Sequence, residues 1–262
     1  MDLMLRGKTA LVTGASKGLG YAAAERLAEE GCSLRLVARS QDLLDKAAAE
    51  LTARHGVEVR TRVLDLAKVE SIEMLDQEAR ETDILVNNAG AIPLGSIEEV
   101  DDQRWRESWD LKVFGYINLT RKVYGAMKAR RAPGVIINII GHAGENLSAN
   151  YLAGTSGCAA LMALTRALGA ASPEVGIRVV GINPGAVLTE RLDGFIRRRA
   201  EQTLGDAERW PELVRNMPFG RTGKPSEIAD AVAFLASERS GYTTGTILTI
   251  DGGISSRANS WL

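Results

Sequence analysis

The chain has 262 residues, 45% hydrophobic and 25% charged, and its 32 basic and 33 acidic side chains leave a formal net charge of −1. This is the composition of a globular protein, and the near-zero charge excludes a general attraction to nucleic acid or to an anionic membrane. Two distant cysteines, Cys32 and Cys158, exclude a cysteine metal cage and favour a reducing, cytoplasmic compartment. No stretch has the ~18 uninterrupted apolar residues that a membrane span requires.

Short β-type runs alternate along the chain with stretches of helical period. This order predicts a parallel sheet with helices on both faces. The expected fold class is α/β, a Rossmann-like doubly wound parallel sheet in a three-layer α/β/α arrangement, forming one domain over residues 1–262. The predicted strands are Thr9–Thr13, Ser33–Ala38, Val57–Leu64, Ile84–Asn87, Val135–Ile140, Ile177–Ile182 and Ile247–Ile250, and the first two helices are Tyr21–Glu30 and Gln41–His55.

A glycine-rich segment, TGASKGLG over Thr13–Gly20, follows the first strand and opens a helix. Glycines let the backbone approach a pyrophosphate closely, and the helix N-terminus offers unpaired N–H groups to the anion. The spacing G-x-x-x-G-x-G differs from G-x-G-x-x-G, but the strand–turn–helix context is the one that dinucleotide binding requires. We expect cofactor contacts here from Gly14, Ser16, Lys17, Gly18, Leu19 and Gly20.

The second strand ends where a protein that binds the ribose 2′-hydroxyl of NAD places Asp or Glu. This chain has Arg39 and Ser40 instead. A guanidinium at this position suits a 2′-phosphate, and Lys17 supplies a second cation. The sequence therefore favours NADP(H) over NAD(H), although both cations also fit a solvated surface.

Over nearly its whole length the chain resembles the short-chain dehydrogenase/reductase family. The segment TGASKGLG matches the family's TGxxxGxG turn, NNAG at Asn87–Gly90 matches its fourth-strand motif, and DGG at Asp251–Gly253 matches its closing motif. The resemblance implies that the residues after the third, fourth and sixth strands also contact the cofactor. These are Asp65, Leu66, Asn88, Ala89, Gly90, Pro184, Gly185, Val187 and Thr189.

The family implies a catalytic tetrad of Asn, Ser and Tyr-x-x-x-Lys, in which the tyrosine exchanges the hydroxyl proton and the lysine keeps its phenol acidic. Here Tyr151 is retained. Thr155 stands at the lysine position, Gly141 at the serine position and Lys112 at the asparagine position. Three of the four positions therefore differ from the family pattern.

Two interpretations stay open. In the first, the protein is an NADP(H)-dependent oxidoreductase that interconverts a carbonyl and an alcohol, with Tyr151 as general acid/base. Lys112 then supplies the ammonium lost at position 155, and His142 hydrogen-bonds the substrate oxygen. In the second, the cofactor pocket survives without this proton transfer, leaving an NADP(H)-binding sensor, a scaffold or an enzyme of a non-redox reaction. A purely structural role is disfavoured, because it does not require a cofactor-shaped glycine turn.

An insertion of about residues 189–220 corresponds to the segment that covers the substrate in the family. Its candidate lid contacts are Leu192, Phe195, Ile196, Trp210 and Met217. Arg197–Arg199 is either a site for an acidic group or a solvated helix face. The resemblance also implies a homodimer or homotetramer that acts on a small molecule, with no nucleic-acid or membrane partner. With only two histidines in the chain, we expect no metal site.

Overall fold

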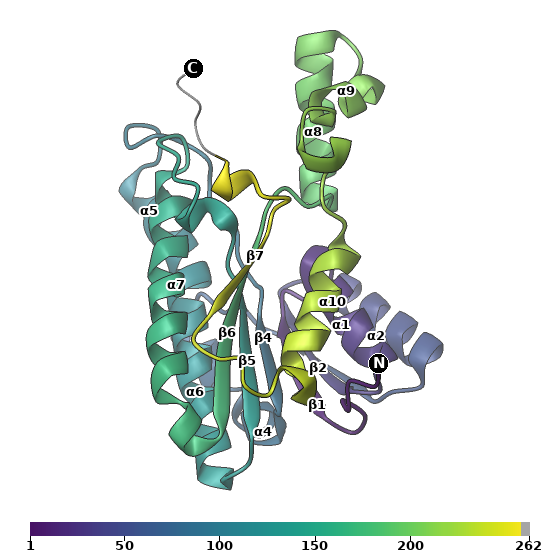
Figure 1. Ribbon diagram of the computed structural model, residues 1–262, viewed down its shortest axis with the longest axis vertical. Helices are drawn as coiled ribbons and strands as arrows, with labels where there is room; N and C mark the ends of the chain where they lie inside the picture. Colours follow the sequence, from purple (N-terminus) through teal and green to yellow (C-terminus); the bar gives the residue numbers. More distant parts are fainter. Residues whose placement is uncertain (258–262) are drawn as a thin grey trace.

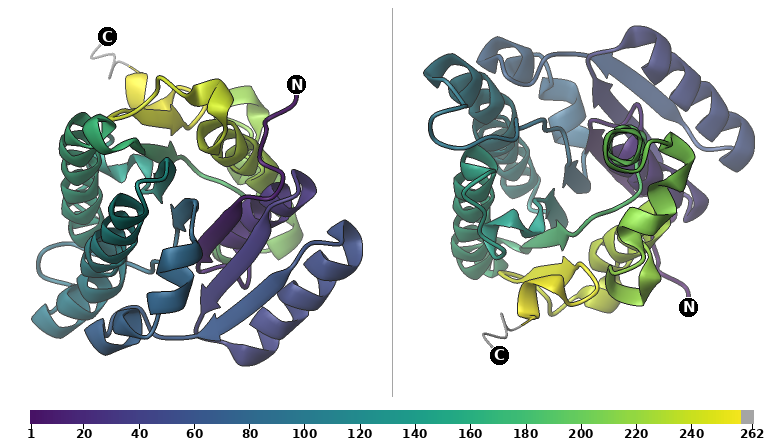
Figure 2. Two further views of the ribbon diagram at one scale, coloured as in Figure 1. Left: turned by 90° about the horizontal axis from the view of Figure 1, so that it is seen from below. Right: turned by 90° about the horizontal axis from the view of Figure 1, so that it is seen from above.

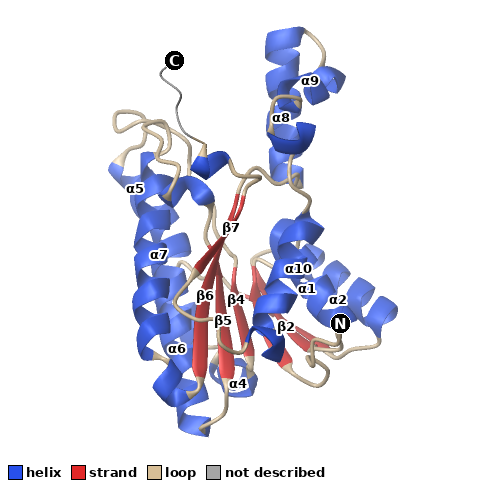
Figure 3. Ribbon diagram, viewed as in Figure 1, coloured by secondary structure: helices blue, strands red, loops and turns tan. Residues whose placement is uncertain are grey.

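A computed structural model describes residues 1–257. Within them lies one sheet of seven parallel strands in the order β3-β2-β1-β4-β5-β6-β7 (Figures 1 and 3). The strand order reverses between β1 and β4, which is the switch point where ligands of such sheets bind. The predicted Rossmann-like fold is confirmed. The strands are β1 Thr9–Thr13, β2 Ser33–Ala38, β3 Val59–Val63, β4 Ile84–Asn87, β5 Gly134–Ile139, β6 Ile177–Pro184 and β7 Ile247–Ile250.

Helices cover both faces of the sheet (Figure 2). On one face α1, α2 and α10 share an apolar core with the strands, and on the other α3, α4, α6 and α7 do the same. Helix α5 continues into α6 through one π-helical turn, η1. The ranges are α1 Gly18–Glu29, α2 Gln41–His55, α3 Val69–Glu73, α4 Asp76–Glu81, α5 Asp102–Trp109, η1 Asp110–Phe114, α6 Gly115–Arg130, α7 Leu152–Ala171 and α10 Pro225–Ala236.

Some element ends differ from those predicted by periodicity. Helix α1 begins at Gly18 rather than Tyr21, because the last glycines of the turn already have helical hydrogen bonding. Strand β6 runs on to Pro184, where its backbone still pairs with β7. Strand β3 is shorter than Val57–Leu64 because it lies at the edge of the sheet and pairs only with β2.

The segment between β6 and α10 forms α8 Glu190–Leu204 and α9 Trp210–Val214. These helices stand away from the sheet at the edge where the strands end (Figure 1). Among the candidate lid residues, Ile196 is buried, whereas Phe195 is 48% exposed. Among the contacts of the segment with the body, Arg191 donates to the carbonyl oxygen of Ile92 at 3.3 Å, and Lys17 pairs with Glu190 at 3.8 Å.

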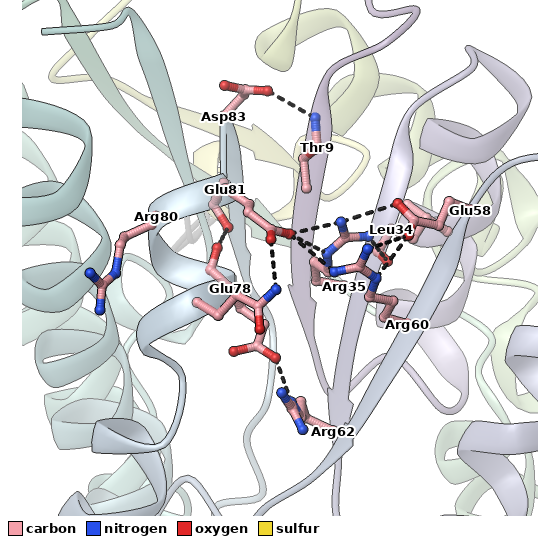
Figure 4. A network of polar contacts seen from close by, with 12 residues as sticks. Thr9, Leu34, Arg35, Glu58, Arg60, Arg62, Glu78, Arg80, Glu81 and Asp83 are labelled. Atoms are coloured by element: carbon pink, nitrogen blue, oxygen red, sulfur yellow. Dashed lines mark hydrogen bonds and ion pairs between the residues drawn. The ribbon is translucent and has the colours of Figure 1, made fainter. Parts of the chain in front are cut away.

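A charged network joins the edge strand β3 to β2 and α4 (Figure 4). The buried Arg35 guanidinium of β2 donates to Glu58 at 3.2 Å and to Glu81 at 2.8 Å. Arg62 of β3 pairs with Glu78 of α4. Because the buried guanidinium is hydrogen-bonded to two carboxylates, its desolvation is offset and the edge is held in register.

No helix within residues 1–257 is long and apolar enough to cross a membrane. The same residues hold no group of three or more His, Cys, Asp and Glu side chains arranged for a metal ion.

Candidate active site

The glycine turn after β1 is built around the side chain of Asn88. Its Nδ2 donates to the carbonyl oxygens of Thr13 at 3.0 Å and Gly14 at 3.3 Å. A Cβ at Gly14 would stand 2.8 Å from that nitrogen, and a Cβ at Gly20 would stand 2.3 Å from the Gly14 oxygen. Gly14 also has φ +62°, which favours glycine. The close approach of turn and amide therefore requires glycine at both positions.

The NNAG segment is fixed to the same turn by Thr13. Its Oγ1 accepts from the backbone N–H groups of Asn88 at 2.9 Å and Ala89 at 3.0 Å. No side chain caps the first turn of α1. The N–H groups at this helix end therefore face the cradle formed by the turn, an arrangement that binds the phosphates of a dinucleotide.

The remaining predicted cofactor residues lie along the same edge of the sheet. The Thr189 methyl is 3.7 Å from a Cβ built at Gly18, and Gly185 packs against Asp251 of the DGG motif. Asp65 Oδ1 accepts from the N–H of Ala67 at 3.1 Å. Loop segments far apart in the sequence are thus brought together at the carboxyl ends of the strands. The other members of the set, Ser16, Leu19, Ser40, Leu66, Gly90, Pro184 and Val187, belong to these same segments.

The two predicted phosphate-binding cations differ in their surroundings. Arg39, at the end of β2, is exposed and makes no hydrogen bond or ion pair within residues 1–257. Lys17 pairs with Glu190 at 3.8 Å, with both side chains more than half exposed. Such an exposed pair contributes little to stability, so the ammonium remains available to an anion.

Tyr151 immediately precedes α7 and lines a cavity of about 450 Å³. Its ring lies over Gly154, where a Cβ would stand 2.1 Å from a ring carbon. Burial raises the pKa of the phenol, Cys158 raises that pKa further, and Arg191 lowers it. The cavity is lined by Leu94, Gly95, Glu99, Arg104, Ser148, Asn150 and Tyr151.

The start of α7 is held from two sides. Trp109 Nε1, on α5, donates to the carbonyl oxygen of Ala153 at 3.0 Å. The hydroxyl of Thr155 contacts the backbone of Ser148. It lies 3.4 Å from the backbone nitrogen and 3.5 Å from the carbonyl oxygen of that residue. Thr155 therefore links the first turn of α7 to the loop before Tyr151.

Gly141, predicted at the family's serine position, has φ +128°. An L side chain rarely adopts this conformation, so a serine would require a different backbone here. The side-chain atom nearest to a Cβ at this position is Cys158 Sγ, at 3.5 Å. The site thus has no hydroxyl at position 141 and a buried thiol behind it.

Lys112 lies in the π-helical turn η1 and is buried. Its Nζ donates to the hydroxyl of Tyr116 at 2.7 Å and to the carbonyl oxygen of Ile139 at 2.8 Å. A Cβ at Gly90 would stand 2.4 Å from Lys112 Cδ, so the glycine of NNAG makes room for the stem. Burial lowers the pKa of Lys112 to about 8, with a smaller opposing effect from Cys158. No hydrogen bond joins Lys112 to Tyr151 in the described part of the chain.

His142 faces the closing DGG segment. Its Nδ1 is 3.9 Å from Asp251 Oδ2 and 3.5 Å from the hydroxyl of Ser255. Burial lowers the pKa of the imidazole, against the opposing influence of Asp251 and Glu145. The ring is therefore oriented through Nδ1 by the C-terminal segment.

The sequence did not predict the contacts that four residues make near the site. These residues are Tyr116, Trp109, Cys158 and Arg191. Tyr116 follows Lys112 by four residues, a spacing that places two side chains on one helix face. That spacing was the available signal for Tyr116. The other three contacts join separate elements, and nothing local in the sequence indicates them.

Comparison with known proteins places this arrangement among dinucleotide-dependent oxidoreductases. Residues 14–255 match a family model described as enoyl-(acyl carrier protein) reductase. Galactitol 2-dehydrogenase (L-tagatose-forming) of Cereibacter sphaeroides is 36% identical over 254 residues, covering 95% of each chain. The chain belongs to the short-chain dehydrogenase/reductase family.

Two solved structures of this family show how closely the fold is kept. L-sorbose reductase from Gluconobacter frateurii, complexed with NADPH and L-sorbose, superposes with a TM-score of 0.92 at 32% identity, over 98% of this chain and 100% of that one. An NAD⁺-bound xylitol dehydrogenase superposes with a TM-score of 0.86 at 29% identity, covering 95% of this chain and 100% of the other. Proteins of this one fold are thus found with either nucleotide bound.

Proposed function

We propose that this short-chain dehydrogenase/reductase interconverts a carbonyl and an alcohol with NADP(H), using Tyr151 as general acid/base. Lys112 provides positive charge in place of the lysine missing at position 155. His142 hydrogen-bonds the substrate oxygen in place of the serine missing at 141. The names of the relatives, which reduce or oxidise sugars and polyols, support the reaction class.

The cofactor part of the proposal is supported by the cradle after β1. The turn Gly14–Gly20 and the first turn of α1 would hold the pyrophosphate, and Asn88 and Thr189 would lie beside it. Arg39, with Lys17, would hold the 2′-phosphate. The bound nucleotide supplies hydride to, or accepts it from, the reacting carbon.

Tyr151 would donate the proton that a reduced carbonyl oxygen takes up, and would accept it in the reverse direction. A phenol whose pKa is raised by burial is a poor acid, so a nearby positive charge is needed to lower that pKa. Cys158 packs in the same buried cluster as Tyr116, which accepts a hydrogen bond from Lys112.

One observation carries the proposal: Lys112 is buried, and its amine has no carboxylate partner within residues 1–257. Its two hydrogen-bond partners are a neutral hydroxyl and a neutral carbonyl. Its charge is therefore not cancelled by an ion pair. A buried charge of this kind is costly to the fold and is typical of functional sites.

The test is NADPH-dependent turnover over a panel of carbonyls that includes a ketose and a 3-oxoacyl thioester. We expect Tyr151→Phe to lower kcat by about 10³-fold, as loss of a general acid does, with the Kd for NADPH unchanged. Lys112→Ala should also lower kcat, and Tyr124→Phe, on α6 away from the cavity, serves as the control. Wild-type rates in both Tyr151→Phe and Lys112→Ala would refute these roles.

A second candidate is an NADP(H)-binding protein that has lost this proton transfer. The observation favouring it is that Lys112 Nζ is engaged by Tyr116 and Ile139, with no bond to the Tyr151 phenol within residues 1–257. The panel separates the two candidates. Tight NADPH binding without turnover of any carbonyl supports the second.

We also propose that residues 189–220 move over the substrate, and that the protein works in the cytoplasm as a homodimer or homotetramer. The charged run Arg197–Arg199 contributes less to this lid than its sequence suggests, because Arg197 pairs with Asp193 and Glu208. Sedimentation of the purified protein measures the assembly. A monomer at micromolar concentration would contradict that part of the proposal.

A further inference from the structure

We infer that Tyr116 is a positioning residue, whose hydroxyl directs the buried amine of Lys112 beside the candidate active site. The inference rests on the proposed function of Lys112, but concerns a residue that neither the motifs nor the relatives indicate. Tyr116 touches no part of the cavity that Tyr151 lines. It acts through Lys112.

The geometry is a closed triangle of polar atoms. Lys112 Nζ donates to Tyr116 Oη at 2.7 Å and to the Ile139 oxygen at 2.8 Å. Tyr116 Oη in turn donates to the same Ile139 oxygen at 2.9 Å. All three distances are those of strong hydrogen bonds, and the phenol proton is used by the carbonyl. The lone pairs of Oη are therefore directed to the amine.

The triangle is closed to water by apolar packing. Tyr116 is 2% exposed, and Val113, Ile140 and Met162 pack in the same cluster. Within such a cluster an amine without partners would pay the full cost of desolvation. The Tyr116 hydroxyl and the Ile139 carbonyl are the groups that offset this cost in the described structure.

The π-helical turn explains why the lysine points inward. Lys112 and Val113 of η1 are both buried, whereas Asp110 and Phe114 are exposed. The wider turn brings Lys112 over Gly90 and within reach of Tyr116, four residues later. Lys112 therefore depends on Gly90 for space and on Tyr116 for a hydrogen-bond partner.

The ionisable groups facing Lys112 come from two elements. Tyr116 is on α6, and burial raises its pKa well above the ordinary value, so it stays neutral. Cys158 is on α7, and burial raises its pKa as well, so the thiol is also neutral near pH 7. The proton that is exchangeable near pH 8 within this cluster is therefore that of Lys112.

The test compares Tyr116→Phe with Tyr124→Phe, which removes a hydroxyl from the same helix but not from the triangle. Loss of the acceptor should lower the pKa of Lys112, because a hydrogen bond to the charged form is removed. We expect the alkaline limb of the NADPH-dependent reduction rate to move down by about 1 pH unit in Tyr116→Phe. In Tyr124→Phe the alkaline limb of the rate profile should lie at the same pH as in wild type.

A second readout needs no turnover. The free energy of unfolding, measured with urea, should begin to rise with pH where buried Lys112 loses its proton. The pH at which this rise begins should be about 1 unit lower in Tyr116→Phe than in wild type. This shift should vanish when Lys112→Met is present in both proteins. A uniform loss of stability without any shift would show a merely structural tyrosine and overturn the inference. If wild type shows no turnover, the proposed function fails, while the urea titration still decides the role of Tyr116.

Discussion

The two ends of the active-site edge differ in how they use the family pattern. At the cofactor end, Thr13, Asn88 and the glycines form a network in which each partner requires the others. At the catalytic end, Tyr151 lines the cavity, and the resemblance predicts Gly141, Thr155 and Lys112 at the other three tetrad positions. Nucleotide binding depends on backbone shape, which tolerates little change. Acid–base chemistry depends on charge, which another side chain of the fold can supply.

The largest effect should come from Gly20→Ala at the cofactor end. Its Cβ would stand 2.3 Å from the oxygen of Gly14, a backbone atom that no change of rotamer can move aside. We expect a loss of about 3 kcal/mol in the free energy of unfolding and NADPH binding weakened by at least about 100-fold. Urea unfolding and fluorescence titration measure the two.

Gly125→Ala on α6 is the matched control, because nothing lies within 4 Å of its Cβ. In an exposed helix this change should stabilise the protein by about 0.5–1 kcal/mol. If Gly20→Ala behaved like this control, the cofactor end would not be the rigid region we describe.

At the catalytic end, Lys112→Met should stabilise the fold while lowering activity. The folded-state pKa of about 8 lies below the ordinary 10.5, so the ammonium costs stability at pH 7. By linkage, wild-type stability rises with pH from about 8 to 10.5, by about 3 kcal/mol at 1.36 kcal/mol per pKa unit. In urea unfolding at pH 7, the variant should therefore have a larger free energy of unfolding than wild type. This difference in stability should narrow above pH 8.

The exposed Lys46 on α2 offers the comparison, since Lys46→Met should leave the pH dependence of stability unchanged. A Lys112→Met protein that is less stable than wild type at pH 7 would mean that the buried amine stabilises the fold.

Arg39→Ala should separate the two nucleotides. Removing the cation should weaken NADPH binding by about 10-fold, the worth of one charge-assisted contact to phosphate, and leave NADH binding unchanged. Titration of both nucleotides into wild type, Arg39→Ala and Lys46→Ala measures this. Equal losses for NADPH and NADH would assign Arg39 to general binding rather than to the 2′-phosphate.

The smallest effect should come from Glu227→Gln, where the chain returns from the lid to α10. Glu227 accepts from Arg221 and from the N–H of Lys224, and these bonds lower its pKa to about 2. The stability that this carboxylate contributes is complete above pH 4.5 and disappears as pH falls through 2. The variant should therefore be slightly less stable than wild type at pH 6, with the gap closing in acid. A gap that persisted at pH 2 would point to lost packing.

Much of the fold could be predicted from local pattern. Apolar runs bounded by turns defined β1, β2, β4 and β7 with their observed limits, and α2 likewise, because strand and helix periods are properties of short segments. The order of those elements was enough to predict the parallel sheet, since parallel neighbours need crossovers. The glycine turn was found because its chemistry is contiguous in the sequence.

The catalytic end was less accessible to sequence reasoning, because its contacts join distant segments. The spacing predicted that Lys112 would be important, but its hydrogen bonds to Tyr116 and Ile139 depend on the π-helical turn and on β5. The sequence also could not show that His142 faces Asp251, more than a hundred residues away. Side-chain direction in such places is set by packing between elements.

The sequence by itself determined the fold class and located the glycine turn, and it predicted which tetrad positions differ from the family pattern. Each of these features depends on a short continuous segment, in which hydrophobic period, turn residues or motif spacing has a local physical cause. Only the tertiary structure decided the environment of Lys112. It buries Lys112 beside Tyr116 and Cys158, and this burial lowers its pKa to about 8, because removing an amine from water disfavours its charged form.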